Sequence, residues 1–114
     1  MLSRRYRFHS RGGVKYVYAH GKTIRHAKIS LVHCPNTRGF QRFAVVVSKK
    51  VDKRAVVRNR IRRRVYEAIR LYKAEQAFRV PKDMVFIIYS KDFFDCPFQK
   101  IQSQIASLIR ESMI

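Results

Sequence analysis

The segment from Lys49 to Arg64 constrains the fold more than any other, because it combines a helical pattern with a very high density of positive charge. Nine of its sixteen residues are Lys or Arg, and Asp52 is its one acidic residue. On a helical wheel of about 100° per residue, one face is apolar and is formed by Val57, Ile61, Val65, Ala68, Ile69 and Tyr72. The opposite face carries Asn59, Arg62, Arg63, Tyr66 and Arg70, with Arg58 and Arg60 on its flanks. One face can therefore enter a core while the other presents guanidinium groups to a partner.

The charge of the whole chain indicates what kind of partner this is. The 114 residues carry a formal net charge of +19, and twelve Lys and Arg residues but no Asp or Glu precede Asp52. A field of this size drives association with polyanions and makes that association salt-dependent. Arg is also favoured over Lys where planar, bidentate phosphate contacts are needed. We therefore expect a nucleic acid partner, with a merely solvated basic helix face as the alternative.

Length and periodicity predict a single α+β domain over residues 1–114, and the charge predicts that this domain binds nucleic acid. The hydrophobic content of 46% is typical of a globular chain of this size. The patterns predict a helix at 11–20, one broken or two short strands within 22–34, a turn at 35–39, a strand at 40–48, a helix at 53–77, a strand at 84–90 and a terminal helix after residue 95. The expected architecture is a sandwich of a small four-stranded sheet and about three helices, in the order α-β-β-β-α-β-α.

Three local features refine this expectation. Ser10 and Gly21 are expected to start and stop the first helix. The strand at 40–48 is nearly continuous in β-branched residues, which is typical of a strand that is central or buried on both faces. Asp95 is the expected N-cap of the terminal helix, with Pro97 in its first turn.

The ionisable residues give little support to a nuclease that acts by itself. Such an enzyme needs paired carboxylates that hold Mg²⁺, or a pair of histidines for general acid–base catalysis. The seven acidic residues are scattered, and Asp92 and Asp95 form their one close pair. The four histidines, His9, His20, His26 and His33, have no recognised ligand spacing. We therefore assign no catalytic and no metal-binding residue.

The cysteines and the apolar segments bear on the compartment. Cys34 and Cys96 match no metal-binding or CxxC spacing, and the apolar runs are too short to span a bilayer. The first residues lack the apolar stretch of a signal peptide. We expect free thiols in a soluble protein of the reducing cytoplasm.

Two motifs in the middle of the chain match a known family. The strand ends in the sequence VSKK, at 47–50, and the long helix opens with RNRIRR, at 58–63. In this order and at this distance, the two motifs resemble the protein subunit of bacterial ribonuclease P. The basic and aromatic arm up to Phe8, the VYAHG run at 17–21 and Glu67 match as well, so the resemblance covers most of the chain.

This resemblance implies a function and a topology. Proteins of the family bind a large catalytic RNA, ribonuclease P RNA, and we expect a one-to-one complex with that RNA. The complex removes the 5′ leader of precursor tRNA as an endoribonuclease, and the RNA carries out the hydrolysis, which requires Mg²⁺. The family also has a left-handed crossover between the strands that flank the long helix, against the usual right-handed rule. The resemblance implies no cofactor for the protein itself.

The resemblance also implies two groups of site residues. The face toward the RNA subunit would consist of Lys49, Lys50, Arg58, Asn59, Arg60 and Arg63. The cleft for the single-stranded leader would involve Phe8, Val14, Tyr18, Arg62 and Tyr66. Val14 replaces an aromatic residue that is usual in the family, and Tyr66 replaces an Arg and offers a possible stacking surface instead.

Other functions remain as alternatives to the subunit role. A structural RNA-binding protein of ribosomal type would have the same composition, and the VSKK and RNRIRR motifs are what argue against it. A stand-alone nuclease is the weaker alternative, for want of converging carboxylates. A sequence-specific DNA reader is weaker still, because no short helix and turn precede the basic helix.

Overall fold

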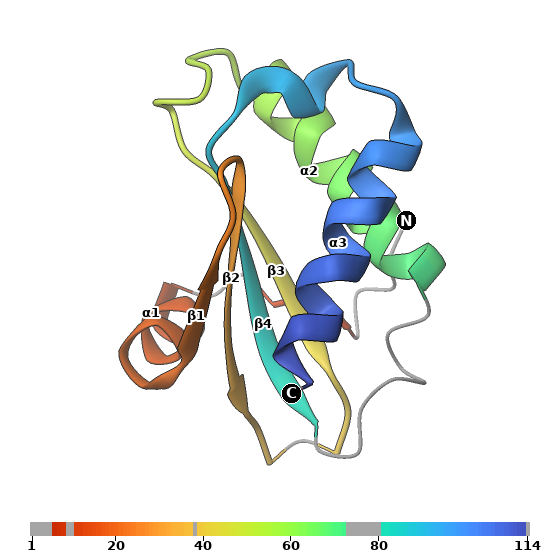
Figure 1. Cartoon of the computed structure of the whole chain (residues 1–114). Coiled ribbons are helices and arrows are strands. Elements are labelled where there is room, and N and C mark those ends of the chain that lie inside the picture. The colour runs from red at the N-terminus through yellow and green to blue at the C-terminus, as the bar shows by residue number, and fades with distance from the viewer. Residues whose placement is uncertain (1–5, 9–10, 38, 73–80, 114) are drawn as a thin grey trace.

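A four-stranded sheet with helices on both of its faces forms the protein (Figure 1). The computed structural model describes residues 6–8, 11–37, 39–72 and 81–113. Its elements, in chain order, are α1 (Arg11–His20), β1 (Lys22–Arg25), β2 (Ile29–Pro35), β3 (Arg42–Val47), α2 (Ala55–Tyr72), β4 (Lys82–Ile88), the short 3-10 helix η3 (Lys91–Phe94) and α3 (Phe98–Ser112). The predicted α+β class, the four strands, the three longer helices and their order are confirmed.

The strands lie in the order β1-β2-β4-β3, so the last strand of the chain sits between two earlier ones. β1 is antiparallel to β2, β2 is antiparallel to β4, and β3 is parallel to β4. The parallel pair is joined through α2, which makes β3, α2 and β4 a crossover unit. The left hand expected for this crossover stays a prediction.

β3 lies at the edge of the sheet, so of the two alternatives expected for it, a strand buried on both faces or a central strand, the first is the one that holds. Most of its residues are nevertheless buried, as its β-branched composition indicated. The central position belongs to β4, which enters between β2 and β3 after the chain has passed through α2. On its outer side β3 meets the N-terminal arm in an isolated bridge, where the Phe8 N–H donates to the Phe43 carbonyl at 2.9 Å. A run of β-branched residues thus reports burial rather than position within a sheet.

The face of the sheet toward α2 and α3 holds the larger part of the core. Alternate strand residues supply its sheet side: Ile29, Leu31, Phe43, Val45, Val47, Met84, Phe86 and Ile88. The apolar stripes of the two helices supply the other side, chiefly Val57, Ile61, Val65, Ile69, Ile101, Ile105, Leu108 and Ile109. Burial of each such side chain contributes roughly 1.5–3 kcal/mol, which fixes how α2 is rotated and therefore which of its residues face solvent.

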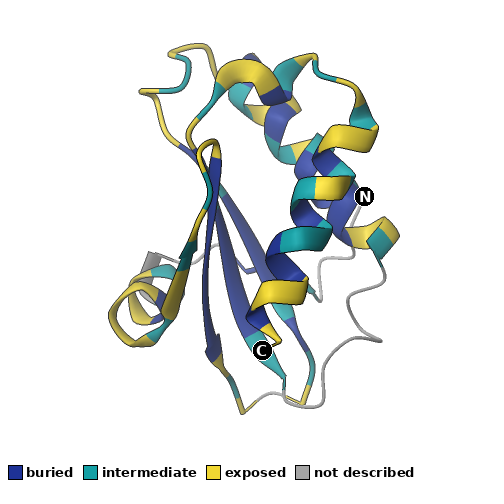
Figure 2. Cartoon of the chain, in the orientation of Figure 1, coloured by how far each residue is buried: buried dark blue, intermediate teal, exposed yellow. Residues whose placement is uncertain are grey.

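The opposite face of the sheet is covered by α1 and has a smaller core (Figure 1). The buried members of this core are Phe8, Val17, Val32, Cys34, Ala44 and Val85. Val14, Val46 and Ile87 pack against it and are half-buried. Figure 2 shows that α1 is mostly exposed, whereas the inner strands beneath it are buried. Val46 and Ile87 are the strand residues of this core that remain partly accessible.

The boundaries of α1 agree with the prediction. The Gly21 N–H donates to the Val17 carbonyl at 2.7 Å and closes the helix. A Cβ atom at Gly21 would lie 2.6 Å from the Val17 oxygen and 2.8 Å from the His33 oxygen, so a larger residue would push α1 away from β2. Ser10, the expected cap, lies outside the described residues.

The two other helices differ from the prediction at their ends. α2 begins at Ala55 rather than at residue 53, and residues 73–77 of its expected span lie outside the described residues. The prediction that Asp95 caps α3 is wrong, because Pro97 occupies the N-cap position and no side chain bonds there. Asp95 instead ends η3, an element that the sequence pattern did not predict. The Ser90 hydroxyl starts η3 by accepting from the Asp92 N–H at 3.1 Å.

The two cysteines are free thiols that belong to different cores. Cys34 is buried on the α1 face, and Cys96 is half-buried on the face that carries α2 and α3. Within the described parts of the chain, no helix has both the length and the apolar character needed to cross a bilayer.

Candidate nucleic-acid interface

The first half of α2 and the loop before it carry the basic residues that the sequence assigns to an RNA subunit, here called the basic surface. Val57 and Ile61 point into the core and are almost completely buried. The residues predicted to face an RNA subunit lie on the other side: Lys49, Lys50, Asn59, Arg60 and Arg63 are exposed, and Arg58 is half-buried. The structure therefore brings all six together at one end of the molecule, and their contact with RNA stays a prediction.

Hydrogen bonds hold the loop before α2 in place. The Arg58 guanidinium donates to the carbonyls of Asp52 and Lys53 at 3.1 and 2.8 Å. Asp52 accepts from the Arg54 backbone at 2.8 Å and pairs with Arg54 and Lys91. The Arg54 side chain is the main cause of the strongly lowered pKa of the Asp52 carboxyl. The carboxylate therefore stays ionised and holds the Arg54 and Lys91 side chains together.

Two further arginines of α2 contact η3. Arg60 donates to the Phe94 carbonyl at 2.9 Å, and its guanidinium lies 4.9 Å from the centre of the Phe94 ring. Arg64 donates to the carbonyls of Phe93 and Cys96 at 2.6 and 2.5 Å. Arg60 is exposed and can do this while facing an RNA, whereas the half-buried Arg64 serves the fold.

Arg62 and Asn59 form a pair on the same surface. The Arg62 guanidinium donates to the Asn59 side-chain oxygen. Partial burial, followed by the charge of Arg58, lowers the pKa of Arg62. The smaller part of this shift comes from the neighbouring cation, and a phosphate group placed here would relieve that repulsion.

Three of the residues predicted for the leader lie on the α1 face of the sheet. Phe8 is buried beneath the Arg42 guanidinium, which lies 4.7 Å from the centre of its ring. Val14 is half-buried, and the Tyr18 side chain is 44% exposed. Burial and the nearby Tyr89 raise the pKa of the Tyr18 hydroxyl. Phe8, Val14 and Tyr18 thus surround the smaller core, and Tyr18 presents its ring to solvent.

The prediction that Tyr66 offers an exposed stacking surface is wrong. Its side chain is 6% exposed and belongs to the core between the sheet and α2. Its hydroxyl accepts the Val45 N–H at 3.2 Å, a donor of the edge strand β3. Burial is the main cause of the raised pKa of Tyr66. A wheel places this residue opposite the apolar stripe, but its long side chain turns back to the sheet edge.

Known proteins match this arrangement over nearly the whole chain. The family model described as "Ribonuclease P" matches residues 2–112. The chain belongs to the ribonuclease P protein family. The "Ribonuclease P protein component" of Chloroflexus aurantiacus is 34% identical over 113 residues, covering 99% of this chain and 82% of that protein. The component of Clostridioides difficile is 35% identical over 100 residues, covering 86% and 83%.

Solved structures of ribonuclease P proteins have the same fold as this family member. The protein from Thermotoga maritima superposes with a TM-score of 0.80 at 22% identity, covering 92% of this chain and 96% of that one. The protein from Staphylococcus aureus superposes with a TM-score of 0.77 at 22% identity, covering 94% of each chain.

The sequence reading of this ribonuclease P family member missed a buried polar cluster beside Phe8. Asp83 accepts from Arg42 at 2.9 and 2.7 Å and from the Asn36 amide at 2.8 Å. The residues come from β4, the start of β3 and the preceding turn, and only the strand register brings them together. The cluster holds the Arg42 guanidinium over Phe8 and so fixes the arm on the sheet.

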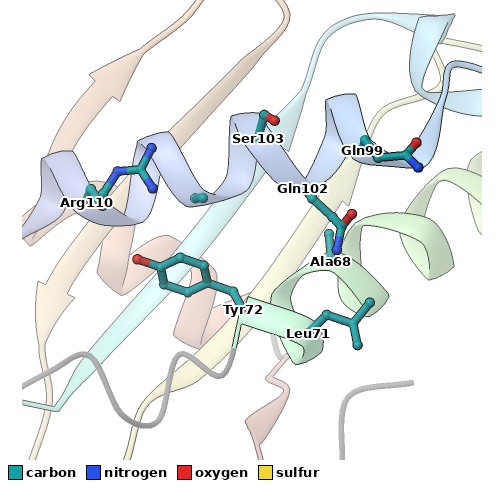
Figure 3. A pocket seen from close by; sticks show the side chains of 8 residues that line it. Ala68, Leu71, Tyr72, Gln99, Gln102, Ser103 and Arg110 are labelled. Atoms are coloured by element: carbon teal, nitrogen blue, oxygen red, sulfur yellow. The ribbon is translucent and has the colours of Figure 1, made fainter.

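A cavity of about 430 Å³ between α2 and α3 was also not predicted (Figure 3). Ala68 and Ala106 provide the space, and the ring of Tyr72 extends from the end of α2 toward α3. The other lining residues are Leu71, Gln99, Gln102, Ser103 and Arg110. This lining holds amide, hydroxyl and guanidinium groups but no carboxylate, thiol or imidazole among the described residues.

The described histidines and acids do not converge. In residues 6–8, 11–37, 39–72 and 81–113, no three His, Cys, Asp or Glu side chains form a group that could hold a metal ion. The His20 ring bonds to the Tyr16 carbonyl at 3.0 Å, and His26 meets Glu111 at 3.0 Å. These bonds are structural contacts at the ends of elements.

Proposed function

We propose that this chain, as a protein component of ribonuclease P, binds the catalytic RNA subunit and the 5′ leader of precursor tRNA. The observation that supports this most directly is the family match over residues 2–112 together with the basic surface that the fold gathers on α2. The relatives named above carry the same component name. Removal of the leader, which gives the mature 5′ end of tRNA, is the reaction that the holoenzyme performs.

The surface toward the RNA subunit is the basic end of the molecule. Lys49, Lys50 and Arg63 are exposed on it and reach phosphates without leaving an internal partner. Arg58 and Arg60 are held by backbone carbonyls, and each guanidinium has five N–H donors in total, so donors remain for phosphate oxygens. Such contacts release counterions and make the affinity fall with rising salt.

The leader binds on the other side of the sheet, beside α1. Single-stranded RNA is held by base stacking on aromatic rings and by cations that follow its phosphates. Tyr18 provides an exposed ring, and Val46 and Ile87 provide a half-buried apolar floor. Arg62, at the edge of the basic surface, is the cation we assign to the leader.

The chemistry belongs to the RNA subunit, which holds the Mg²⁺ ions that activate water and stabilise the leaving oxygen. The chain contributes position and charge: it orients the leader and reduces the repulsion between two polyanions. No residue of the protein is assigned to proton transfer.

The test compares protein, RNA subunit and holoenzyme on one precursor tRNA. We expect no specific cleavage by the protein alone, and cleavage by the RNA at a lower Mg²⁺ concentration once the protein is added. Cleavage at the leader junction by protein alone, surviving stringent nuclease controls, would establish the stand-alone nuclease instead. Tight RNA binding with no effect on the Mg²⁺ requirement would indicate a structural binder of ribosomal type.

A further inference from the structure

Val46 and Ile87 form a half-buried apolar strip on the α1 face of the sheet. Beyond its end lies an exposed tyrosine, Tyr89, that the sequence pattern did not single out. Tyr89 directly follows β4, and its N–H donates to the Lys28 carbonyl at 2.9 Å. This bond continues the ladder between β2 and β4 by one residue, so the alternation of faces extends to Tyr89. Val85 and Ile87 point toward α1, and Tyr89 therefore points to the same face.

Tyr18 stands on the helix that covers the same face. It follows Val17, which is buried against the sheet, and lies one turn after the half-buried Val14. After burial, which is the larger cause, Tyr89 contributes to the raised pKa of the Tyr18 hydroxyl. Tyr18 and Tyr89 are 44% and 47% exposed, so both present surface to solvent on this face.

The strip between these rings and the basic loop is apolar. Val46 and Ile87 are direct neighbours in the register of β3 and β4, and both are half-buried. Val47 pairs with Ile88, so Ser48 comes level with Tyr89, and the exposed Lys49 and Lys50 follow at once. A chain that crosses Val46 and Ile87 thus meets an aromatic ring immediately before it meets the lysines.

We propose that Tyr89 is a second stacking residue for unpaired RNA, acting with Tyr18 on the same strand. The inference rests on the proposed binding of the leader and adds the residue that connects the α1 face to the Lys49–Lys50 turn. The partner is a single strand rather than a duplex, because only unpaired bases expose the ring faces that a tyrosine stacks on. Stacking does not require a particular base, so the contact tolerates different leader sequences.

The first experiment measures the affinity of the assembled holoenzyme for precursor tRNA and for mature tRNA. A stacked base contributes roughly 1–3 kcal/mol, so Tyr89→Ala is expected to weaken binding of precursor tRNA about fivefold or more and to leave mature tRNA unchanged. Tyr89→Phe keeps the ring and is expected to bind like the parent. Tyr16→Ala is the matched control, because Tyr16 is 56% exposed on α1 but stacks on His20 at 4.2 Å between ring centres.

A second experiment reads stacking directly. Precursor tRNAs that carry 2-aminopurine at successive leader positions lose fluorescence where the base stacks on a ring. We expect one leader position to recover fluorescence with Tyr89→Ala, a different position to recover with Tyr18→Ala, and neither to change with Tyr16→Ala.

The outcomes separate this inference from the proposed function. If Tyr18→Ala weakens precursor binding and relieves quenching while Tyr89→Ala does neither, Tyr89 is not a stacking residue and the leader site stands without it. If neither variant distinguishes precursor from mature tRNA, the leader site on the α1 face is itself wrong. If Tyr89→Ala weakens both ligands alike, the residue acts on the fold or on the RNA subunit, and the inference is overturned.

Discussion

At the scale of single residues, the arginines of α2 differ in what already holds them. Arg58, Arg60 and Arg64 donate to backbone carbonyls of the loop before α2 or of the η3 region. Arg63 is exposed on the same helix and lies next to Arg64. Arg63 is therefore available for binding, whereas its neighbour Arg64 stabilises the fold. Single substitutions should separate these two effects.

We expect Arg63→Ala to weaken binding to the RNA subunit without affecting stability. Loss of one phosphate contact should reduce the magnitude of the slope of log K against log[salt] by about one unit. Arg64→Ala removes two bonds to carbonyls, and we expect it to lower the free energy of unfolding by about 2 kcal/mol. Thermal melts and binding titrations at several salt concentrations measure both effects. Equal melting temperatures for the two variants would contradict the assignment of Arg63 to binding and Arg64 to stability.

His33 makes stability depend on pH. It is buried on β2, and burial, followed by the charges of Lys82 and Lys22, lowers its pKa below the usual value. Above about pH 6.5 both the folded and the unfolded chain carry this ring neutral. As the pH falls below that value, the unfolded chain binds a proton that the folded chain does not, so the free energy of unfolding decreases.

We therefore expect urea denaturation midpoints to fall between about pH 7.5 and 5.5, a range that covers the ordinary pKa of histidine. His33→Gln removes the titrating ring and should flatten this dependence, whereas His20→Gln, on the exposed end of α1, should leave it as it is. An equal slope in all three proteins would show that His33 does not cause it.

At the scale of elements, β3 depends on groups outside the sheet for its free edge. The arm supplies the bridge at Phe43, and Tyr66 of α2 accepts the Val45 N–H. We expect Tyr66→Phe to lower the free energy of unfolding by about 1 kcal/mol, because a buried donor loses its partner. Its affinity for precursor tRNA should equal that of the parent, measured beside its melting curve. If Tyr66→Phe lowered the affinity for precursor tRNA without changing stability, Tyr66 would belong to the leader site.

The elements also show how far the sequence could be interpreted. Periodicity located α1, the strands and α2, because apolar stripes record which side of an element is buried. It could not place β4 between β2 and β3, since strand order depends on pairing between distant segments. It could not find the Asp83 cluster for the same reason. Tyr66 was misplaced because a wheel gives the direction of Cα–Cβ bonds and not the reach of a long side chain.

The site was anticipated to a similar degree. The basic face of α2 follows directly from the sequence pattern, and the structure gathers its six predicted residues at one end. Tyr89 falls inside the predicted strand at 84–90, but the observed strand ends at Ile88, and its continuous apolar run does not indicate which face a residue takes. Its direction became clear only from the bond to Lys28.

At the scale of the whole molecule, the net charge of +19 destabilises the folded chain but strengthens its binding to a polyanion. Self-repulsion destabilises the compact chain, and salt screens it. We expect the melting temperature of the free protein to rise when NaCl is raised from about 0.05 to 0.3 M, where the Debye length falls well below 10 Å. Over the same range the affinity for the RNA subunit should fall steeply. Parallel melts and titrations check this, and a melting temperature that falls with salt would refute it.

The central position of β4 determines when the fold can form during synthesis. The ribosome releases β2, β3 and the entire basic helix before the strand that joins them exists, since β4 begins only at Lys82. Until then the nascent chain exposes two strands whose shared neighbour is missing, and the arginines of α2 are presented without a sheet to orient them. Because the pairings of β4 span long stretches of sequence, the sheet closes late and as a unit. The basic surface of α2 is thus made before the strand that completes the sheet, and it takes its final shape only after that strand has paired.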